Sequence, residues 1–429
     1  MISLLNNFFH KHKTSIKCEF LAACTTFVTM AYIIIIAPQM LAQTGMPYHA
    51  VFTATCLVVI IGCVLSALLA NLPIAFAPGL GLLSFFSYVV VAQLHYSWQV
   101  GLGMVFVSGV LFFIFTISRI RQMILTAIPA SLGSAIAAGI GFFIAFIALR
   151  NVNLVVSNSH TLLALGAVHS EQLILFFIGF IVIAVLDAHC VPGAILIGIV
   201  TVTILSSLLG LNHITDVFYW PSSLSDSFLH LSFDHWRSTQ WLTVVFTFLI
   251  VALFDSTGTL LALTKMLPMK TKQAQFKRVN RALVAESATS ILSALLGCTT
   301  TAPMVENSAG LRAGGRTGLT AIFIALFFVL MLFLAPLTAA IPSYATSSAL
   351  FYVGCLMVKP FSNVNWHEPS DYIPAVITLL MIPLTFSIAD GVGLGLICYC
   401  VLKVASGKWR QLHPFLWILT LMFLVYFII

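Results

Sequence analysis

Two acidic residues lie within long apolar stretches of the sequence, Asp255 in VALFDSTGTLLALT and Glu306 in CTTTAPMVENSAG. A carboxylate near the centre of a bilayer costs on the order of 3 kcal/mol or more, so such residues usually face a polar cavity and serve a function. Carboxylates accept hydrogen bonds from N–H groups and exchange protons. We therefore expect these two residues to hold a solute or a proton.

The composition is that of an integral membrane protein. Hydrophobic residues make up 60% of the 429 positions and charged residues only 7%, whereas about a quarter of a soluble domain is charged. The 9 cysteines are scattered, lack metal-site spacing and are expected to be buried thiols. The start of the chain lacks a cleavage site, so no cleaved signal peptide is expected. No Gly-x-x-x-x-Gly-Lys-Ser/Thr, Gly-x-Ser-x-Gly or His-Glu-x-x-His run occurs, which argues against ATP-driven transport, a membrane hydrolase and a cofactor.

Apolar runs long enough to cross a bilayer recur along the whole chain. They predict an all-α polytopic membrane protein with fourteen segments, at residues 18–41, 50–70, 74–93, 100–118, 129–149, 172–187, 191–211, 241–264, 282–297, 302–313, 318–338, 343–358, 372–388 and 390–405. The remaining apolar segment, 414–429, is marginal for crossing.

The basic residues predict the orientation. With the N-terminus in the cytoplasm, all but Arg150 and Arg237 of the 19 Lys and Arg residues fall on the cytoplasmic side, as the positive-inside rule requires. They include the basic loop Lys265–Arg281. This topology accounts for the net charge of +7 without nucleic-acid binding. It predicts a protein of the plasma or inner membrane, with the lipid bilayer as its surroundings and segment 212–240 as an external loop.

The two halves of the chain resemble each other weakly. Ala77-Pro78 matches Ala302-Pro303, and Asp187 matches Asp390, in the same order along each half. Seven segments per half, over residues 1–211 and 241–413, would insert the second half with opposite polarity, as in many secondary transporters. Segments three and ten are both interrupted by Pro and Gly, and such paired interruptions indicate a binding site at the midplane of the membrane.

Several motifs resemble the nucleobase–cation symporter family of xanthine and uracil permeases, and most of all its azaguanine-resistance-like purine permeases. They run from about residue 25 to 402 and read TTFVTMAYIIIIAPQML, FAPGLGLLSFFSY, LFDSTGTL, GGRTGLTA, IPSYATSSAL and MIPLTFSIADGVGLG. The resemblance implies 7+7 inverted repeats, with a core domain of spans 1–4 and 8–11 and a gate domain of spans 5–7 and 12–14. It also implies short strands that break spans 3 and 10, proton-coupled import of a nucleobase and, commonly, a homodimer.

In that family an acid of span eight and one of span ten bind the base, and these positions are Asp255 and Glu306 here. The chain departs from the family pattern where its span-three asparagine is replaced by Leu83 and its first-span Asn-Pro by Ala37-Pro38. The pocket has therefore lost polar groups. A purine of the guanine, hypoxanthine or adenine type remains the expected substrate, and a permease for a pyrimidine or another heterocycle is the alternative.

The expected chemistry is hydrogen bonding to a flat ring. Ionised carboxylates accept strong, charge-assisted bonds from ring N–H groups. Glu306 is the expected principal ligand and Asp255 the expected proton carrier, although the two can titrate as a unit. The other predicted substrate-binding residues are Leu83, Ser84, Phe85, Met304 and Val305. Structural roles remain open for both acids, as do a uniporter and an anion transporter on the same plan.

Overall fold

The computed structural model of the chain describes residues 14–118, 129–158, 160–212, 220–221, 223–268 and 271–428. Its regular structure is almost entirely helical, with two short two-stranded sheets. Eight helices within these ranges are long and apolar enough to cross a membrane, and three more apolar helices are shorter. The prediction of an all-helical polytopic membrane protein is confirmed. The predicted cytoplasmic cations Lys11, Lys13, Arg119, Arg121 and Lys270 lie outside the described residues.

The helices and strands follow the predicted segments closely. The first half contains α2 (Ile16–Met30), α3 (Ile33–Ala42), α4 (Tyr48–Leu65), the π-helix η1 (Ser66–Ala70), β1 (Phe76–Pro78), α5 (Leu80–Ser84), the π-helix η2 (Phe85–Gln93), α6 (Trp98–Ile117), α8 (Ala130–Asn151), β2 (Val155–Asn158), β3 (Leu162–Leu165), α9 (Glu171–Ala188) and α10 (Ala194–Leu208). The second half contains α11 (Thr239–Lys265), α12 (Lys272–Leu296), β4 (Thr301–Pro303), α13 (Asn307–Arg312), α14 (Gly318–Met331), η3 (Leu332–Leu334), α15 (Ala335–Ala339), α16 (Ser343–Val358), η4 (Lys359–Asn363), α17 (Pro369–Thr385), α18 (Ile388–Ala405), η5 (Trp409–Gln411) and α19 (Pro414–Ile428).

One predicted boundary is wrong. Helix α12 begins at Lys272, whereas the sequence predicted a loop up to Arg281 and an apolar segment from residue 282. The extra turns carry Lys272, Lys277 and Arg278. Hydropathy detects only the apolar part of a helix, and lysine and arginine are themselves good helix formers, so a charged extension of the same helix escapes it.

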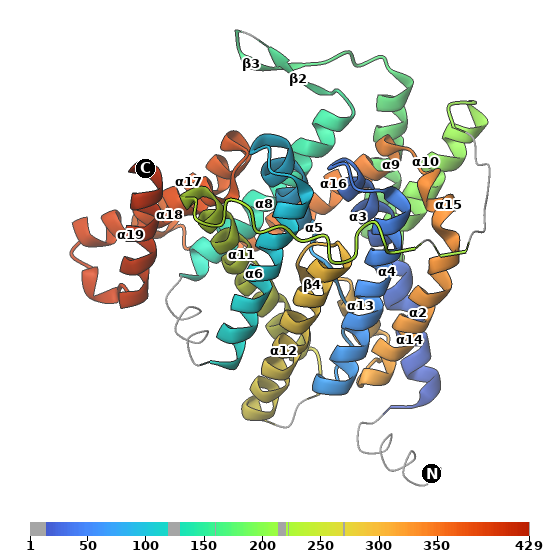
Figure 1. Cartoon of the computed structure of the whole chain (residues 1–429), viewed down its shortest axis with the longest axis horizontal. Helices are drawn as coiled ribbons and strands as arrows, with labels where there is room; N and C mark the ends of the chain where they lie inside the picture. The colour runs from blue at the N-terminus through green and yellow to red at the C-terminus, as the bar shows by residue number, and fades with distance from the viewer. Residues whose placement is uncertain are drawn as a thin grey trace.

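The third and tenth segments are broken by strands β1 and β4, as the resemblance implied. The strands pair antiparallel, with Phe76 opposite Pro303, Ala77 opposite Ala302 and Pro78 opposite Thr301. All six of these residues are buried. Lipid cannot satisfy backbone N–H and C=O groups, so interrupted helices inside a membrane protein need partners from the protein for their exposed backbone, and pairing the two strands provides some of them. This pairing joins the two halves of the chain near the middle of the fold (Figure 1).

The helices form two groups by their contacts. Helices α8, α9, α10, α16, α17 and α18 pack chiefly on one another, and α2, α4, α6, α12, α13 and α14 form the other group. Within the first group, α8 and α16 approach closely because both have glycine at the crossing. A Cβ on Gly141 would lie 2.6 Å from the carbonyl oxygen of Gly354. Small residues allow this close approach between membrane helices.

Two connections lie outside the helix bundle. The segment 223–238 crosses one face of the molecule (Figure 1) and is tied to helix ends, because Leu229 N–H donates to Leu295 O at 2.8 Å and Ser232 N–H to Gln99 O at 3.0 Å. Part of the predicted external loop, 213–219 and residue 222, lies outside the described residues. The β2–β3 hairpin projects beyond the helices (Figure 1).

Helix α19 packs along α18. The Cys400 sulfur lies 3.1 Å from the Thr420 hydroxyl oxygen, and a Cβ on Gly393 would lie 2.6 Å from the Phe423 ring. Residue numbers rise along α19 as they fall along α18, so the two helices are antiparallel. The C-terminal apolar segment is thus part of the helical bundle.

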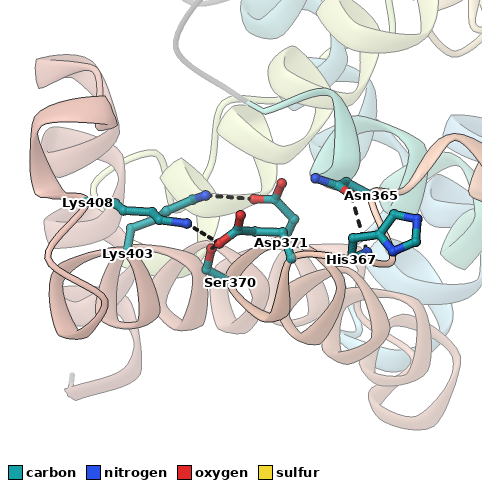
Figure 2. Close-up of polar contacts among 7 residues, drawn as sticks. Asn365, His367, Ser370, Asp371, Lys403 and Lys408 are labelled. Atoms are coloured by element: carbon teal, nitrogen blue, oxygen red, sulfur yellow. Dashed lines mark hydrogen bonds and ion pairs between the residues drawn. The ribbon is translucent and has the colours of Figure 1, made fainter.

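Two ion pairs connect the beginning of α17 with the end of α18 (Figure 2). The Lys403 ammonium lies 3.0 Å from Asp371, with side-chain exposures of 5% and 17%, and 5.4 Å from the centre of the Tyr399 ring. Lys408 donates to Glu368, and this hydrogen bond lowers the pKa of Glu368 from its ordinary value. Both pairs fix the hairpin of α17 and α18 at one end.

Candidate functional site

Glu306 lies where the broken tenth segment resumes its helix. Strand β4 ends at Pro303, and Glu306 is the N-cap residue of α13. Its side chain is half-buried, and Val305 beside it is 66% exposed. A carboxylate is favourable at this place because the N-terminus of a helix carries a partial positive charge. The predicted principal ligand is thus at the strand crossing.

A tyrosine from the first half of the chain contacts this acid. Helix α2 ends at Met30 and α3 begins at Ile33, so Tyr32 lies in a two-residue interruption of the first apolar segment. The tyrosine is 1% exposed. Its hydroxyl donates a hydrogen bond to Oε1 of Glu306 at 2.5 Å.

Asn307 fixes the backbone on the other side of Glu306. Its Oδ1 accepts the Ala75 N–H at 2.8 Å, and its Nδ2 donates to Ala75 O at 3.0 Å and to Met304 O at 2.6 Å. The side chain is completely buried. One amide therefore satisfies backbone groups at the start of β1 and at the end of β4, where both helices are interrupted.

Asp255 lies on α11, and its side chain is exposed. Helix α11 contacts β4, α5 and α13. Phe248, seven residues before Asp255 and therefore on the same face of the helix, packs against Phe85 with ring centres 5.0 Å apart. The second predicted acid thus belongs to the helix that borders the strand crossing. Both acids come from the second half of the chain.

A buried polar cluster supports β4 from the side of α12. Ser256, next to Asp255, donates to the carboxylate of Glu286. Ser290 accepts the N–H of Thr301 at 3.1 Å, and the hydroxyl of Thr301 donates to Glu286 O at 3.3 Å. Ser256, Glu286 and Ser290 are completely buried. These contacts connect α11 with α12, and α12 with the strand β4 that precedes Glu306.

The remaining predicted binding residues lie near the crossing, but most are covered. Leu83 and Ser84 are completely buried, Phe85 is 1% exposed and Met304 7%. The Ser84 hydroxyl donates to Leu80 O at 2.8 Å, which is a backbone carbonyl of its own helix. Contact of these four residues with a substrate remains a prediction.

The chemistry of this site is that of an acceptor for N–H groups. Glu306 offers a carboxylate held by a tyrosine hydroxyl, and Asp255 places an exposed carboxylate on the helix that borders the crossing. In the described part of the chain no group of three His, Cys, Asp or Glu residues is placed to hold a metal ion. Sequence reasoning overlooked Tyr32 and Asn307. Tyr32 lies inside one of the recognised motifs, and Asn307 is a polar residue that directly follows the acid in an apolar stretch.

Comparison with known proteins shows extensive similarity. The model of a permease family, Xan_ur_permease, matches residues 17–393. The chain is 38% identical to adenine permease AdeP of Escherichia coli (strain K12) over 97% of this chain and 93% of the relative. It is 38% identical to guanine/hypoxanthine permease PbuO of Bacillus subtilis (strain 168) over 97% and 98%. The transmembrane domain of the cyanobacterial bicarbonate transporter BicA has a similar fold, with a TM-score of 0.66 at 16% identity, over 88% of this chain and 97% of that one.

Proposed function

This chain belongs to the Xan_ur_permease family of membrane permeases, and from that premise we propose that it is a symporter importing a purine nucleobase together with a proton. Transport would proceed by alternating access across the plasma or inner membrane. The observation that carries the proposal is the acid at the strand crossing: Glu306 begins α13 beside the paired strands and is held by Tyr32. The relatives named adenine permease and guanine/hypoxanthine permease support a purine.

The proposed architecture has fourteen membrane segments in two inverted repeats of seven, residues 1–211 and 241–413. The helix group containing α2, α4, α6, α12, α13 and α14, together with α11, would form the core domain of spans 1–4 and 8–11. The group containing α8, α9, α10, α16, α17 and α18 would form the gate domain of spans 5–7 and 12–14. Strands β1 and β4, at matching places of the two halves, support the repeat. The N-terminus would be cytoplasmic, and the homodimer stays a prediction.

The proposed binding mode uses Glu306 as the principal acceptor of ring N–H groups. Its side chain is half-buried, and charge-assisted hydrogen bonds are stronger where water is partly excluded. Val305, Met304 and the residues Leu83, Ser84 and Phe85 across the strand pair would contact the ring. A site that pairs each polar atom of the base rejects analogues that lack one, because its own buried groups are left unpaired.

Asp255 is the proposed proton carrier. In the low dielectric of the membrane, charging a carboxylate is costly, so a proton on Asp255 would ease the movement of the loaded core through the bilayer. If proton and base favour each other's binding, the inward proton gradient drives uptake of the base. Replacement by Asn mimics the protonated acid. Asp255→Asn is therefore expected to abolish pH-driven accumulation while exchange of labelled for unlabelled base continues.

A permease for pyrimidines is the nearest alternative, and competition of labelled hypoxanthine by uracil separates the two. An anion transporter is the alternative suggested by the fold, since BicA is named a bicarbonate transporter. Two carboxylates at the site oppose an inorganic anion by charge repulsion. A uniporter would bind the same base without the proton.

The test is uptake by proteoliposomes of labelled adenine, guanine, hypoxanthine and uracil, with and without an imposed pH gradient. We expect at least one purine to accumulate above its external concentration only with an inward proton gradient. Accumulation of a base to the same level with and without the pH gradient would refute proton coupling. Failure of all three purines, with uptake of uracil or bicarbonate, would overturn the purine assignment.

A further inference from the structure

Tyr32 is the contact from the first half of the chain to Glu306, and its hydroxyl lies at hydrogen-bonding distance from the acid although 274 residues separate the two in sequence. The ring is almost completely buried, so packing fixes the direction of the hydroxyl. We propose that Tyr32 is a positioning residue that holds the carboxylate of Glu306 in the orientation in which it receives the substrate. This inference rests on the proposed function, because it assumes that Glu306 binds the transported base.

A free glutamate side chain has three rotatable bonds, and ordering it when the ligand arrives reduces affinity. The hydroxyl of Tyr32 engages Oε1 before any ligand is present. This leaves Oε2 of a preoriented carboxylate to accept a ring N–H. A hydrogen bond to an ionised acceptor is about twice as strong as a neutral one, so a single contact suffices to select one orientation.

The backbone of Glu306 is fixed independently. Asn307 binds both polar atoms of the Ala75 peptide, so the chain around Glu306 is anchored to the start of β1. Helix α13 also packs directly on α2, whose end leads into Tyr32. Backbone and side chain of the acid are thus held by the same helix group, and the carboxylate would keep its orientation when that group moves relative to the other.

A purely structural role makes a different prediction. If the contact only satisfies the buried phenol hydroxyl, removing that hydroxyl would change the stability of the protein and leave substrate affinity as it was. If Tyr32 positions the acid, the change falls on affinity. Measurement of KM separately from Vmax distinguishes the two roles.

The experiment compares Tyr32→Phe with Tyr48→Phe in proteoliposomes, using the labelled base that the wild-type protein takes up best. The control also removes one tyrosine hydroxyl, which donates to Thr338 at 3.2 Å away from the strand crossing. We expect Tyr32→Phe to raise KM about tenfold, equivalent to about 1.4 kcal/mol, with Vmax within about twofold of wild type. Tyr48→Phe should change neither parameter.

An unchanged KM in Tyr32→Phe overturns the inference, whatever happens to its thermal stability. If Tyr32→Phe does not fold, Glu306→Asp replaces it, because the shorter side chain draws the carboxylate away from a retained Tyr32 hydroxyl. A KM equal to wild type in that variant also overturns the inference. Wild-type protein that takes up no base contradicts the proposed function itself, which separates the two failures.

Discussion

Replacement of Asn307 by alanine tests how the strand crossing is held together. The change removes hydrogen bonds to the Ala75 N–H, the Ala75 carbonyl and the Met304 carbonyl, at 2.8, 3.0 and 2.6 Å. The two carbonyls keep backbone partners, since Met304 N–H donates to Ala75 O at 3.4 Å and Asn307 N–H to Met304 O at 3.2 Å. The Ala75 N–H loses the partner that Asn307 provides.

The loss in stability is the sum of the cost of the unpaired N–H and the smaller cost of the two weakened carbonyl contacts. A buried donor left without a partner costs about 1–3 kcal/mol, and each of the two weakened carbonyl contacts contributes about 0.5–1.5 kcal/mol. We therefore expect Asn307→Ala to destabilise the protein by about 2–6 kcal/mol. The assay is thermal unfolding of purified protein in detergent, together with uptake of the labelled base, which should fall because β1 and β4 frame the site.

Asn363→Ala is the matched control, because that asparagine is exposed in η4. The melting temperature of this variant and its uptake of the labelled base should equal those of wild type. A melting temperature of Asn307→Ala equal to that of the control, with normal uptake, would refute the assignment of Asn307 as the residue that joins the two interrupted helices.

Three other contacts give expectations of the same kind. Glu19 is completely buried and accepts the N–H groups of Arg316 and Thr317, just before α14, at 3.2 and 3.3 Å. Glu19→Ala should therefore remove the acceptor of both N–H groups, destabilise the protein by about 3 kcal/mol and lower its melting temperature. Lys403→Met should cost about 2–3 kcal/mol in thermal unfolding, less than a fully buried pair, because Asp371 keeps some exposure. Thr420→Cys should form a disulfide with Cys400 under mild oxidation, seen as a shift in gel mobility.

Each of these three changes has a control. Glu171 is exposed at the start of α9, and Glu171→Gln should leave the melting temperature unchanged. A second change of Asp371 to leucine in the Lys403→Met background should restore most of the lost stability, since the unpaired carboxylate is then removed. Leu421 is 63% exposed, and Leu421→Cys should not cross-link. Equal cross-linking to Cys400 in the Thr420→Cys and Leu421→Cys variants would contradict the packing of α19 on α18.

The helical segments could be predicted from the amino-acid sequence, because hydropathy is a property of whole segments and does not depend on tertiary contacts. The predicted segments coincide with helices to within a few residues, apart from the charged start of α12. The interruptions of segments three and ten follow from Pro78 and Pro303, which lack a backbone N–H and interrupt helices at matching places, whereas the strands β1 and β4 were implied by the family resemblance. The pairing partner of each strand, 225 residues away, was inferable only from the family resemblance.

Of the residues around the site, the sequence alone pointed to the two acids. Asp255 and Glu306 stand out because an acid in an apolar stretch is costly wherever the stretch lies. Tyr32 and Asn307 stand out less, because neither side chain is charged and each gains its role only from a tertiary contact. Their roles depend on distances between segments remote in sequence, and hydropathy contains no information about those distances.

Equilibrium binding of labelled adenine and hypoxanthine to purified protein separates recognition by the acid at the strand crossing from transport. We expect saturable binding of at least one of the two bases to wild type and to Asn363→Ala, and an affinity at least about tenfold lower in Glu306→Gln. Equal affinity in wild type and Glu306→Gln would contradict recognition of the base by this acid.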